Sequence, residues 1–170
     1  MRAALPCLAG LLILGAAPAH AELIKSFQLS ATIANGCSVS TTGTGTWGDI
    51  SLGSVSSVAS GSASANLLSG ANTGMQVSCT PGLSVQVSAD NGNQPVGGVR
   101  QLVHSVNSAS KVPYQLYANN SATPWTTQTI TLSFPTGTSL QSLPVKATAT
   151  LAAPMRAGAY SDTVHVTLSW

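Results

Sequence analysis

The chain carries few residues of the kinds that perform chemistry in proteins. Its 170 residues include three cysteines, three histidines and four acidic residues. The motifs G-x-S-x-G and H-E-x-x-H do not occur in the sequence, and neither does a phosphate-binding P-loop. Asp90 lies in "ADNGN", where we expect a turn role, and His104 and His165 lie in strand-like segments. We therefore expect no enzymatic activity, no metal site and no cofactor.

The first 21 residues are typical of a secretory signal peptide. Arg2 supplies the positive charge, residues 8–17 form an apolar stretch, and Ala19-His20-Ala21 is a cleavage site of the A-x-A type. The apolar stretch is shorter than the roughly 20 residues that a membrane-spanning helix needs. We expect cleavage after Ala21, which also removes Cys7, and export of residues 22–170 as one domain.

Cys37 and Cys79 remain after cleavage. In an exported protein, two cysteines most simply form one disulfide. A metal site or a reactive thiol is the alternative, but neither cysteine belongs to a C-x-x-C motif or has a histidine close by in sequence. The residues themselves therefore favour a disulfide between Cys37 and Cys79.

Charge is scarce along the whole chain. Only 6% of the residues are charged, and the formal net charge is +2. Proteins that bind nucleic acid or anionic membranes usually carry a clustered basic surface, and this sequence has none. We expect no nucleic-acid partner.

Most of the chain shows the two-residue periodicity of half-buried strands. Clusters of Gly, Pro, Asn and Asp separate the strand-like segments, which is typical of an antiparallel β-sandwich. The Ser/Ala/Gly-rich stretch 51–74 fits either a long loop or weak edge strands. The expected strands cover residues 83–89, 99–106, 112–119, 125–134, 142–151 and 160–170.

Two amphipathic segments lie at opposite ends of the exported chain. The last one places Tyr160, Val164, Val166, Leu168 and Trp170 at alternating positions, with Ser, Thr and His between them. The first one, residues 23–33, alternates in the same way and is followed by no turn that would pair it with the next strand. Its apolar face consists of Phe27, Leu29, Ala31 and Ile33.

Four stretches together resemble a known family. They are "ATIANGC" (31–37), "MQVSCTPG" (75–82), "YQLYANN" (114–120) and "GAYSDTVHVTLSW" (158–170). The chain resembles the spore coat protein U domain, that is, the Csu-type pilins of archaic chaperone–usher fimbriae. The resemblance implies an all-β fold, an incomplete immunoglobulin-like antiparallel sandwich whose last strand is missing.

The resemblance also implies a division of the chain and a set of partners. Residues 1–21 would be the signal peptide, 22–34 a donor-strand extension and 35–170 the pilin domain. Phe27, Leu29, Ala31 and Ile33 would fill an acceptor groove of the neighbouring subunit, lined by Tyr160, Val164, Val166, Leu168 and Trp170. A periplasmic chaperone would fill the groove before assembly, and an outer-membrane usher would secrete the fibre. The protein would then reach the surface of a Gram-negative bacterium and support attachment and biofilm formation.

Two other functions are compatible with parts of this pattern. A fimbrial tip adhesin would carry an exposed binding site, but it would not need a donor strand. A small secreted lectin or hydrolase would have a complete sandwich and be a soluble monomer. Trp47, Trp125 and Trp170 are the aromatic residues that a sugar site would use, although packing is their more common role.

Overall fold

The computed structural model describes residues 28–40 and 46–170, and within them every regular element is a β-strand. The predicted all-β, antiparallel class is confirmed, because every strand pair that forms a ladder is antiparallel. In this part of the chain, no helix is long and apolar enough to cross a membrane. Residues 34–170 form one compact unit; the remaining described residues, 28–33, belong to a second unit and contain no strand. The predicted signal peptide and Phe27 lie outside the described residues.

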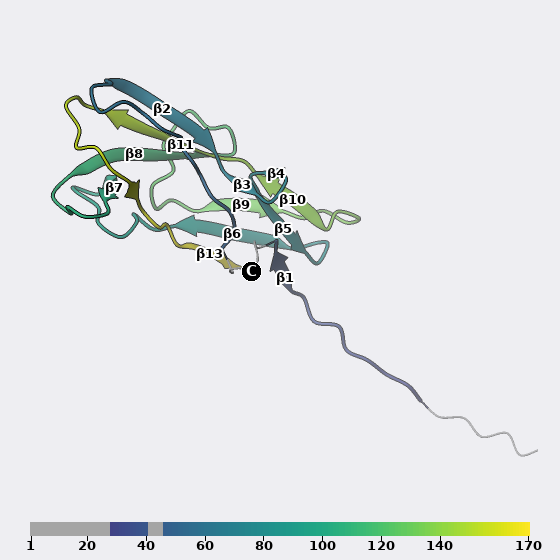
Figure 1. Ribbon diagram of the computed structural model, residues 1–170. Helices are drawn as coiled ribbons and strands as arrows, with labels where there is room; N and C mark the ends of the chain where they lie inside the picture. Colours follow the sequence, from purple (N-terminus) through teal and green to yellow (C-terminus); the bar gives the residue numbers. More distant parts are fainter. Residues whose placement is uncertain (1–27, 41–45) are drawn as a thin grey trace, which may run out of the picture. The chain divides into compact units, whose positions relative to one another are not determined.

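The strands carry the labels of Figure 1. They are β1 (Cys37–Val39), β2 (Gly61–Asn66), β3 (Leu68–Ser69), β4 (Asn72–Thr73), β5 (Met75–Cys79), β6 (Ser84–Ala89), β7 (Arg100–His104), β8 (Lys111–Ala118), β9 (Ile130–Ser133), β10 (Leu140–Leu143), β11 (Val145–Leu151), β12 (Tyr160–Ser161) and β13 (Val166–Ser169).

Three sheets surround the core. Their strand orders are β1-β5-β10, β12-β7-β8-β11-β2 and β13-β6-β9, and β3 and β4 form a small separate hairpin. Alternating apolar residues of β5, β6, β8 and β11 are buried, as the two-residue period of a strand requires. The largest fully buried side chains are Trp125, Phe134, Met75, Leu143, Val77, Val85 and Val87.

Pro144 divides the segment that the sequence pattern predicts as one strand, 142–151. β10 pairs with β5 on one side of the proline, and β11 pairs with β2 and β8 on the other. A proline donates no main-chain hydrogen bond, so the ladder is interrupted there. The chain thus passes from one sheet to another at Pro144, and its carbonyl accepts a hydrogen bond from the Asn119 N–H instead.

Two other segments differ from the simple pattern. Within 125–134 only Ile130–Ser133 forms a strand, because the Trp125 ring is buried and its Nε1–H donates to the Gln128 carbonyl. The stretch 51–74 contains β2, β3 and β4, so the expectation of weak edge strands describes it better than that of a single long loop.

The two cysteines of the exported chain meet between β1 and β5. Cys37 lies directly opposite Cys79 in the strand register, and their sulfur atoms are bonded, with an S–S distance of 2.11 Å. β1 is short and pairs only with β5. The disulfide therefore adds a covalent connection between β1 and the core. Cys79 is buried and Cys37 half-buried.

Removing this bond should destabilise the fold strongly. Cys79→Ser opens a loop with a sequence separation of 42. In the chain-entropy description such a loop contributes about 4 kcal/mol to the free energy of unfolding. We expect a sharply lower yield of folded protein and a lower urea midpoint for Cys79→Ser. Peptide mapping without reductant should recover a cross-linked Cys37–Cys79 peptide, and two free thiols would contradict the bond.

Candidate functional site: an open edge beside the last strand

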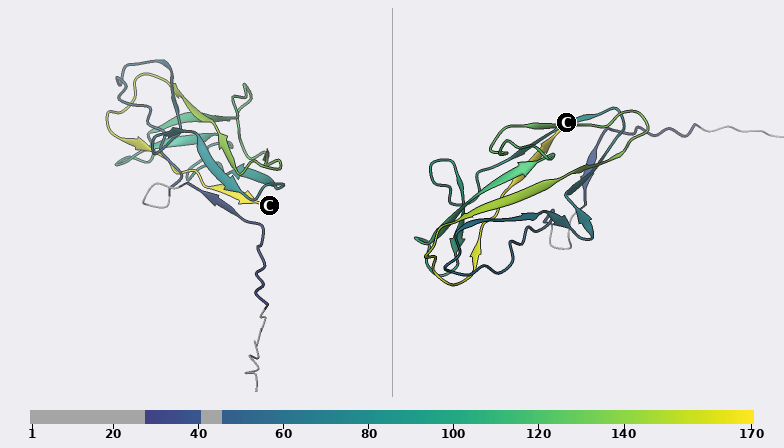
Figure 2. Two further views of the ribbon diagram at one scale, coloured as in Figure 1. Left: turned by 90° about the vertical axis from the view of Figure 1, so that its right-hand side faces the viewer. Right: turned by 90° about the horizontal axis from the view of Figure 1, so that it is seen from above.

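Within the described part of the chain, each of the three larger sheets has two outer strands that pair on one side only, and β1 and β13 are two of these six strands. β1 is an outer strand of the order β1-β5-β10, and β13 is an outer strand of β13-β6-β9. Among the described residues, no strand pairs with the second edge of either. β1 and β13 lie near each other in Figure 1 and in both views of Figure 2. Two unpaired edges at one place form a template for an added strand.

The start of β1 and the end of β13 lie at the same end of the unit. Cys37, the first residue of β1, pairs with Cys79 at the end of β5. Ser169, the last residue of β13, pairs with Gln86 near the start of β6. Only a turn at Pro81-Gly82 separates β5 from β6. β12 therefore marks the opposite end of the last strand.

The apolar face of the last strand is only half covered. Tyr160, Val164, Val166 and Leu168 are half-buried and pack against the core, whereas Trp170 remains 59% exposed. Four of the five residues predicted to line a groove thus share one inward face, and the fifth lies mostly in solvent. Such a face still has apolar surface to bury against another chain segment.

An apolar cleft of about 610 Å³ lies at the β12 end. It lies between the segment 50–57 and the inner face of the five-stranded sheet, and it includes the side chain of Tyr160. The apolar residues that line it are Ile50, Leu52, Val55, Ala63, Leu102, Val112, Ala149, Leu151, Met155, Ala157, Ala159 and Tyr160. The half-covered face of the last strand therefore leads into a cleft with room for further apolar side chains.

The predicted donor segment is unburied where it is described. Leu29 and Ile33 are 91% and 92% exposed, and Ala31 is exposed as well. Residues 28–36 form no strand within the chain. Exposure of two large apolar side chains to water is unfavourable, so burial of this segment against another apolar surface would be favourable. Its role as a donor strand stays a prediction.

The motif Gly158-Ala-Tyr-Ser-Asp162 attaches β12 to β7. Tyr160 pairs with His104 in the strand register, and their rings make an edge-to-face contact with centroids 5.0 Å apart. Gly158 has φ +146°, and a Cβ at this position would come within 2.2 Å of His104 Nε2. The glycine is therefore required by the close approach of the main chain to the histidine ring.

His104 is a structural residue. Its Nδ1 accepts hydrogen bonds from the N–H groups of Val106 and Asn107, and its Nε2 lies 3.1 Å from the carbonyl of Ala157. A neutral ring with its proton on Nε2 satisfies all three contacts. The buried ring thus orders the loop after β7 and the approach to β12 together.

Asp162 is a polar residue on the inward face of the last strand. Its Oδ2 accepts a hydrogen bond from the Tyr114 hydroxyl at 2.7 Å, and its Oδ1 accepts one from the Asn93 N–H at 2.9 Å. Burial raises the pKa of Tyr114 far above its usual range, and the bond to Asp162 raises it further, so the phenol remains a donor. Gly92 leaves room for this carboxylate, because a Cβ there would collide with Oδ2.

Asp90 holds the chain just before β13. The Asp90 N–H donates to the His165 carbonyl, and the His165 N–H donates back to Asp90 Oδ1 at 3.0 Å. The His165 ring forms an ion pair with Asp90 Oδ2 at 2.8 Å, with side chains that are 70% and 43% exposed. Burial raises the pKa of Asp90, but hydrogen bonds from Gly92 and His165 outweigh this effect, so the pKa lies below its usual range.

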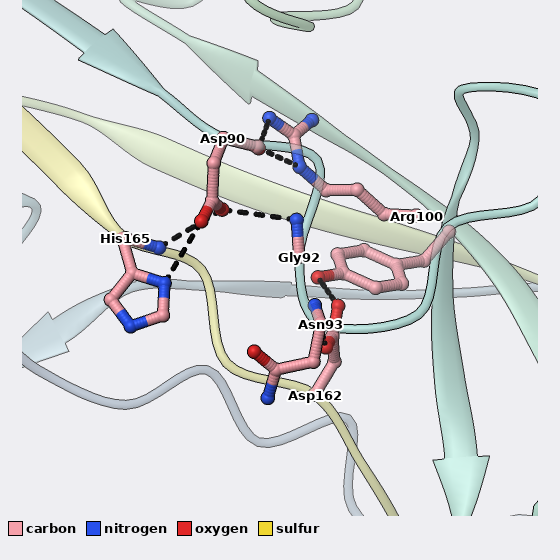
Figure 3. A network of polar contacts seen from close by, with 7 residues as sticks. Asp90, Gly92, Asn93, Arg100, Asp162 and His165 are labelled. Carbon is pink, nitrogen blue, oxygen red and sulfur yellow. Dashed lines mark hydrogen bonds and ion pairs between the residues drawn. The ribbon is translucent and has the colours of Figure 1, made fainter.

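Arg100 completes this network next to the main chain of Asp90 (Figure 3). Its guanidinium is buried and donates to the main-chain carbonyls of Asp90, Trp125 and Thr126. Burial lowers the pKa of Arg100, and neighbouring anionic groups oppose the shift. The arginine thus joins the end of β6 to the loop that precedes β9.

These polar groups have hydrogen-bond partners within the protein. The carboxylates of Asp90 and Asp162 are occupied by hydrogen bonds to the protein, and both nitrogens of His104 have partners. The described residues contain no group of three His, Cys, Asp or Glu side chains that could hold a metal ion. The arrangement is suited to binding a strand.

Sequence reasoning noted Gly158, Asp162 and Tyr114 only as parts of the stretches that carry the family resemblance, gave them no role at this site, and did not single out Arg100. One signal was present for Asp162, because residue 162 has the same parity as Tyr160 and Val164 and interrupts an apolar face. For Tyr114 and Arg100 the partners lie far away along the chain, so no local pattern indicates them.

Comparison with known proteins agrees with the fold. The family of the Spore Coat Protein U domain matches residues 23–167. No curated protein matches the chain. Among solved structures, a chaperone–tip adhesion subunit pre-assembly complex, CsuC–CsuE, from archaic chaperone–usher Csu pili of Acinetobacter baumannii shows a similar fold. The identity is 20%, the TM-score is 0.54, and the match covers 82% of this chain and 40% of that chain.

A second solved structure, a chaperone–tip adhesin complex of CFA/I fimbriae, is more distant. Its identity is 14% and its TM-score 0.41, over 64% of this chain and 35% of that chain. The present chain thus spans less than half the length of either structure that it matches.

Gly158→Ala should lower stability through a steric and a backbone effect. A Cβ at this position would lie 2.2 Å from His104 Nε2, at a φ that alanine rarely adopts. We expect a loss of about 1–3 kcal/mol in the free energy of unfolding, measured in urea. Gly36→Ala is the control, because a Cβ at Gly36 has no neighbour within 4 Å. Equal behaviour of the two variants would contradict the packing of Gly158.

The Asp90 contacts should make stability depend on acid pH. Because the pKa of Asp90 is lowered in the folded state, its stabilisation is present above the usual aspartate pKa of about 4. It is lost as the pH falls through the lower folded value. The difference in thermal midpoint between wild type and Asp90→Asn should therefore shrink with falling pH. Asp49→Asn, an exposed aspartate that bonds to Leu68 through its main chain, should show no such trend.

Proposed function

The chain belongs to the Spore Coat Protein U domain family, and we propose that it is a structural, non-enzymatic subunit of a chaperone–usher fimbria. In this role each subunit receives the N-terminal strand of a neighbouring copy at its open edge. The observation that carries the proposal is the half-covered apolar face of the last strand beside two unpaired sheet edges. The same chain carries an exposed amphipathic extension that suits this edge.

The energetics of such an exchange are favourable. An added strand forms main-chain hydrogen bonds with the open edges, while its apolar side chains enter the half-covered face. Burial of Phe27, Leu29 and Ile33 would contribute roughly 5–9 kcal/mol in total, at about 1.5–3 kcal/mol each. The cost of ordering the segment reduces this gain.

The positions of β1, β12 and β13 favour one direction for the incoming strand. The acceptor's own extension joins its domain at Cys37, beside the end of β13. In an extended fibre the donor's domain must therefore lie at the opposite pole, beside β12. Ile33 is separated from the donor's own β1 only by Ala34, Asn35 and Gly36, so Ile33 would sit close to the apolar cleft. The donor then runs antiparallel to β13.

The partners follow from the same open edge. Before assembly the edge needs a temporary cover, which a periplasmic chaperone would provide, and an outer-membrane usher would release the growing fibre. The similar structure from Acinetobacter baumannii is a complex of a chaperone with a pilus subunit, which supports this class of partner. Residues 1–21 would direct the chain to the periplasm, and the fibre at the cell surface would support attachment and biofilm formation.

A tip adhesin is the second candidate, because the similar structure contains a tip adhesion subunit. The extension at residues 22–34 favours a shaft subunit, since a terminal adhesin has no neighbour to which it would donate. A closed lectin-like sandwich is less well supported, because the apolar face of the last strand is only half covered within the described chain.

Leu29→Asp should abolish donation without affecting folding. The aspartate would bring an unpaired charge into an apolar groove, at a cost of several kcal/mol that opposes most of the gain. The groove of the variant itself is unchanged, so we expect normal chaperone binding in a pull-down and few or no surface fibres by electron microscopy.

Ser30→Asp is the matched control. Residue 30 lies on the opposite face of the extension, so its charge would point to solvent. We expect fibres from this variant. Normal fibres from Leu29→Asp would overturn the donor assignment, and loss of chaperone binding together with fibres would indicate a role of the extension in folding.

A further inference from the structure

The last strand changes sheets between β12 and β13. Tyr160 and Ser161 pair with β7, whereas Val166–Ser169 pair with β6. Residues 162–165 between them belong to no strand, although side chains continue to alternate between half-buried and exposed. We call residues 162–165 the break. Every second residue still faces inward there, so the last strand changes sheets at the break and keeps a single inward face.

Polar contacts hold the break at both of its ends. At the first end, Asp162 accepts hydrogen bonds from Tyr114 of β8 and from the Asn93 N–H. At the second end, the Asp90 N–H donates to the His165 carbonyl, the His165 N–H donates to Asp90 Oδ1, and the His165 ring contacts Asp90 Oδ2. Figure 3 shows the two aspartates on either side of the loop that contains Gly92.

From this arrangement we infer that Asp162 is a positioning residue that keeps the groove in its binding shape while the groove is empty. The inference rests on the proposed function. The contacts of Asp162 all lie within one chain, whereas the apolar face of β13 is only half-buried until a donor arrives. Apolar packing alone would therefore order this strand only after binding.

We expect the Asp162 contacts to make capture of the donor strand faster and tighter. A strand that is ordered in advance loses less conformational entropy when the donor binds. If the Asp162 contacts are absent, only a fraction of empty subunits has β12 and β13 in place, and the apparent affinity falls by that fraction. Once a donor is bound, its own main-chain bonds also hold β13, so we expect the rate of donor dissociation to depend less on Asp162.

The test measures capture of a labelled peptide with the sequence of residues 22–34. The acceptor is the full exported chain with Leu29→Asp in its own extension, so that copies do not donate to one another. We compare this acceptor with one that also carries Asp162→Ala. We expect an association rate about tenfold lower for Asp162→Ala, from loss of hydrogen bonds to a charged group. The dissociation rate should change little, and the peptide should raise the thermal midpoint of Asp162→Ala by less than it raises that of the parent.

Three further variants complete the comparison. Asp162→Ala leaves the buried Tyr114 hydroxyl without its acceptor, which is unfavourable in itself. Tyr114→Phe combined with Asp162→Ala removes this unpaired hydroxyl, while the contact between β8 and the last strand is still absent. This double variant should also capture slowly. Asp162→Asn retains an acceptor for the Asn93 N–H and should restore part of the rate. Asp49→Ala, at an exposed aspartate, should equal the parent.

The outcomes separate the inference from the proposed function. Failure of the parent acceptor to capture the peptide would overturn the proposed function. Capture by the parent with an unchanged rate for Asp162→Ala and for the double variant would overturn the inference alone. A faster dissociation of the peptide from Asp162→Ala with an unchanged association rate would show that Asp162 acts only in the bound complex, and would overturn the inference as well.

Discussion

The last strand of this unit is bonded on one side only, and most other features of the structure relate to that edge. β13 pairs with β6, and no strand in the described part of the chain occupies its other edge or the free edge of β1. Main-chain groups at such an edge are left to water, and the apolar side chains above the core remain half covered. An added strand would pair with these main-chain groups and would also cover the exposed apolar surface.

An open edge also has to be kept ordered. The protein does this with polar contacts inside the chain, because apolar packing at the edge is incomplete. Buried His104 orders the loop after β7, and buried Arg100 donates to three main-chain carbonyls. Asp90 and Asp162 then fix the two ends of the break in the last strand. Hydrogen bonds have strict geometry, so a few of them can hold a strand whose apolar neighbour is absent.

Local patterns predicted much of the fold. β6, β8 and β11 lie within segments where apolar residues alternate, because a strand places successive side chains on opposite faces. The same pattern placed Tyr160, Val164, Val166 and Leu168 on one face, where the structure has them half-buried. The pattern did not show that Pro144 and residues 162–165 divide two long segments, since side chains alternate in the same way before and after a change of sheet.

By itself, the sequence determined the all-β class, the turn positions and the two amphipathic segments at either end of the exported chain. These depend on the conformational preferences and polarity of neighbouring residues, which are local properties. Only the tertiary structure decided which edges remain unpaired and how Asp162, Tyr114 and Asn93 meet. Those contacts join residues that lie far apart along the chain. Their geometry depends on how the sheets pack around the core, and no local pattern encodes it.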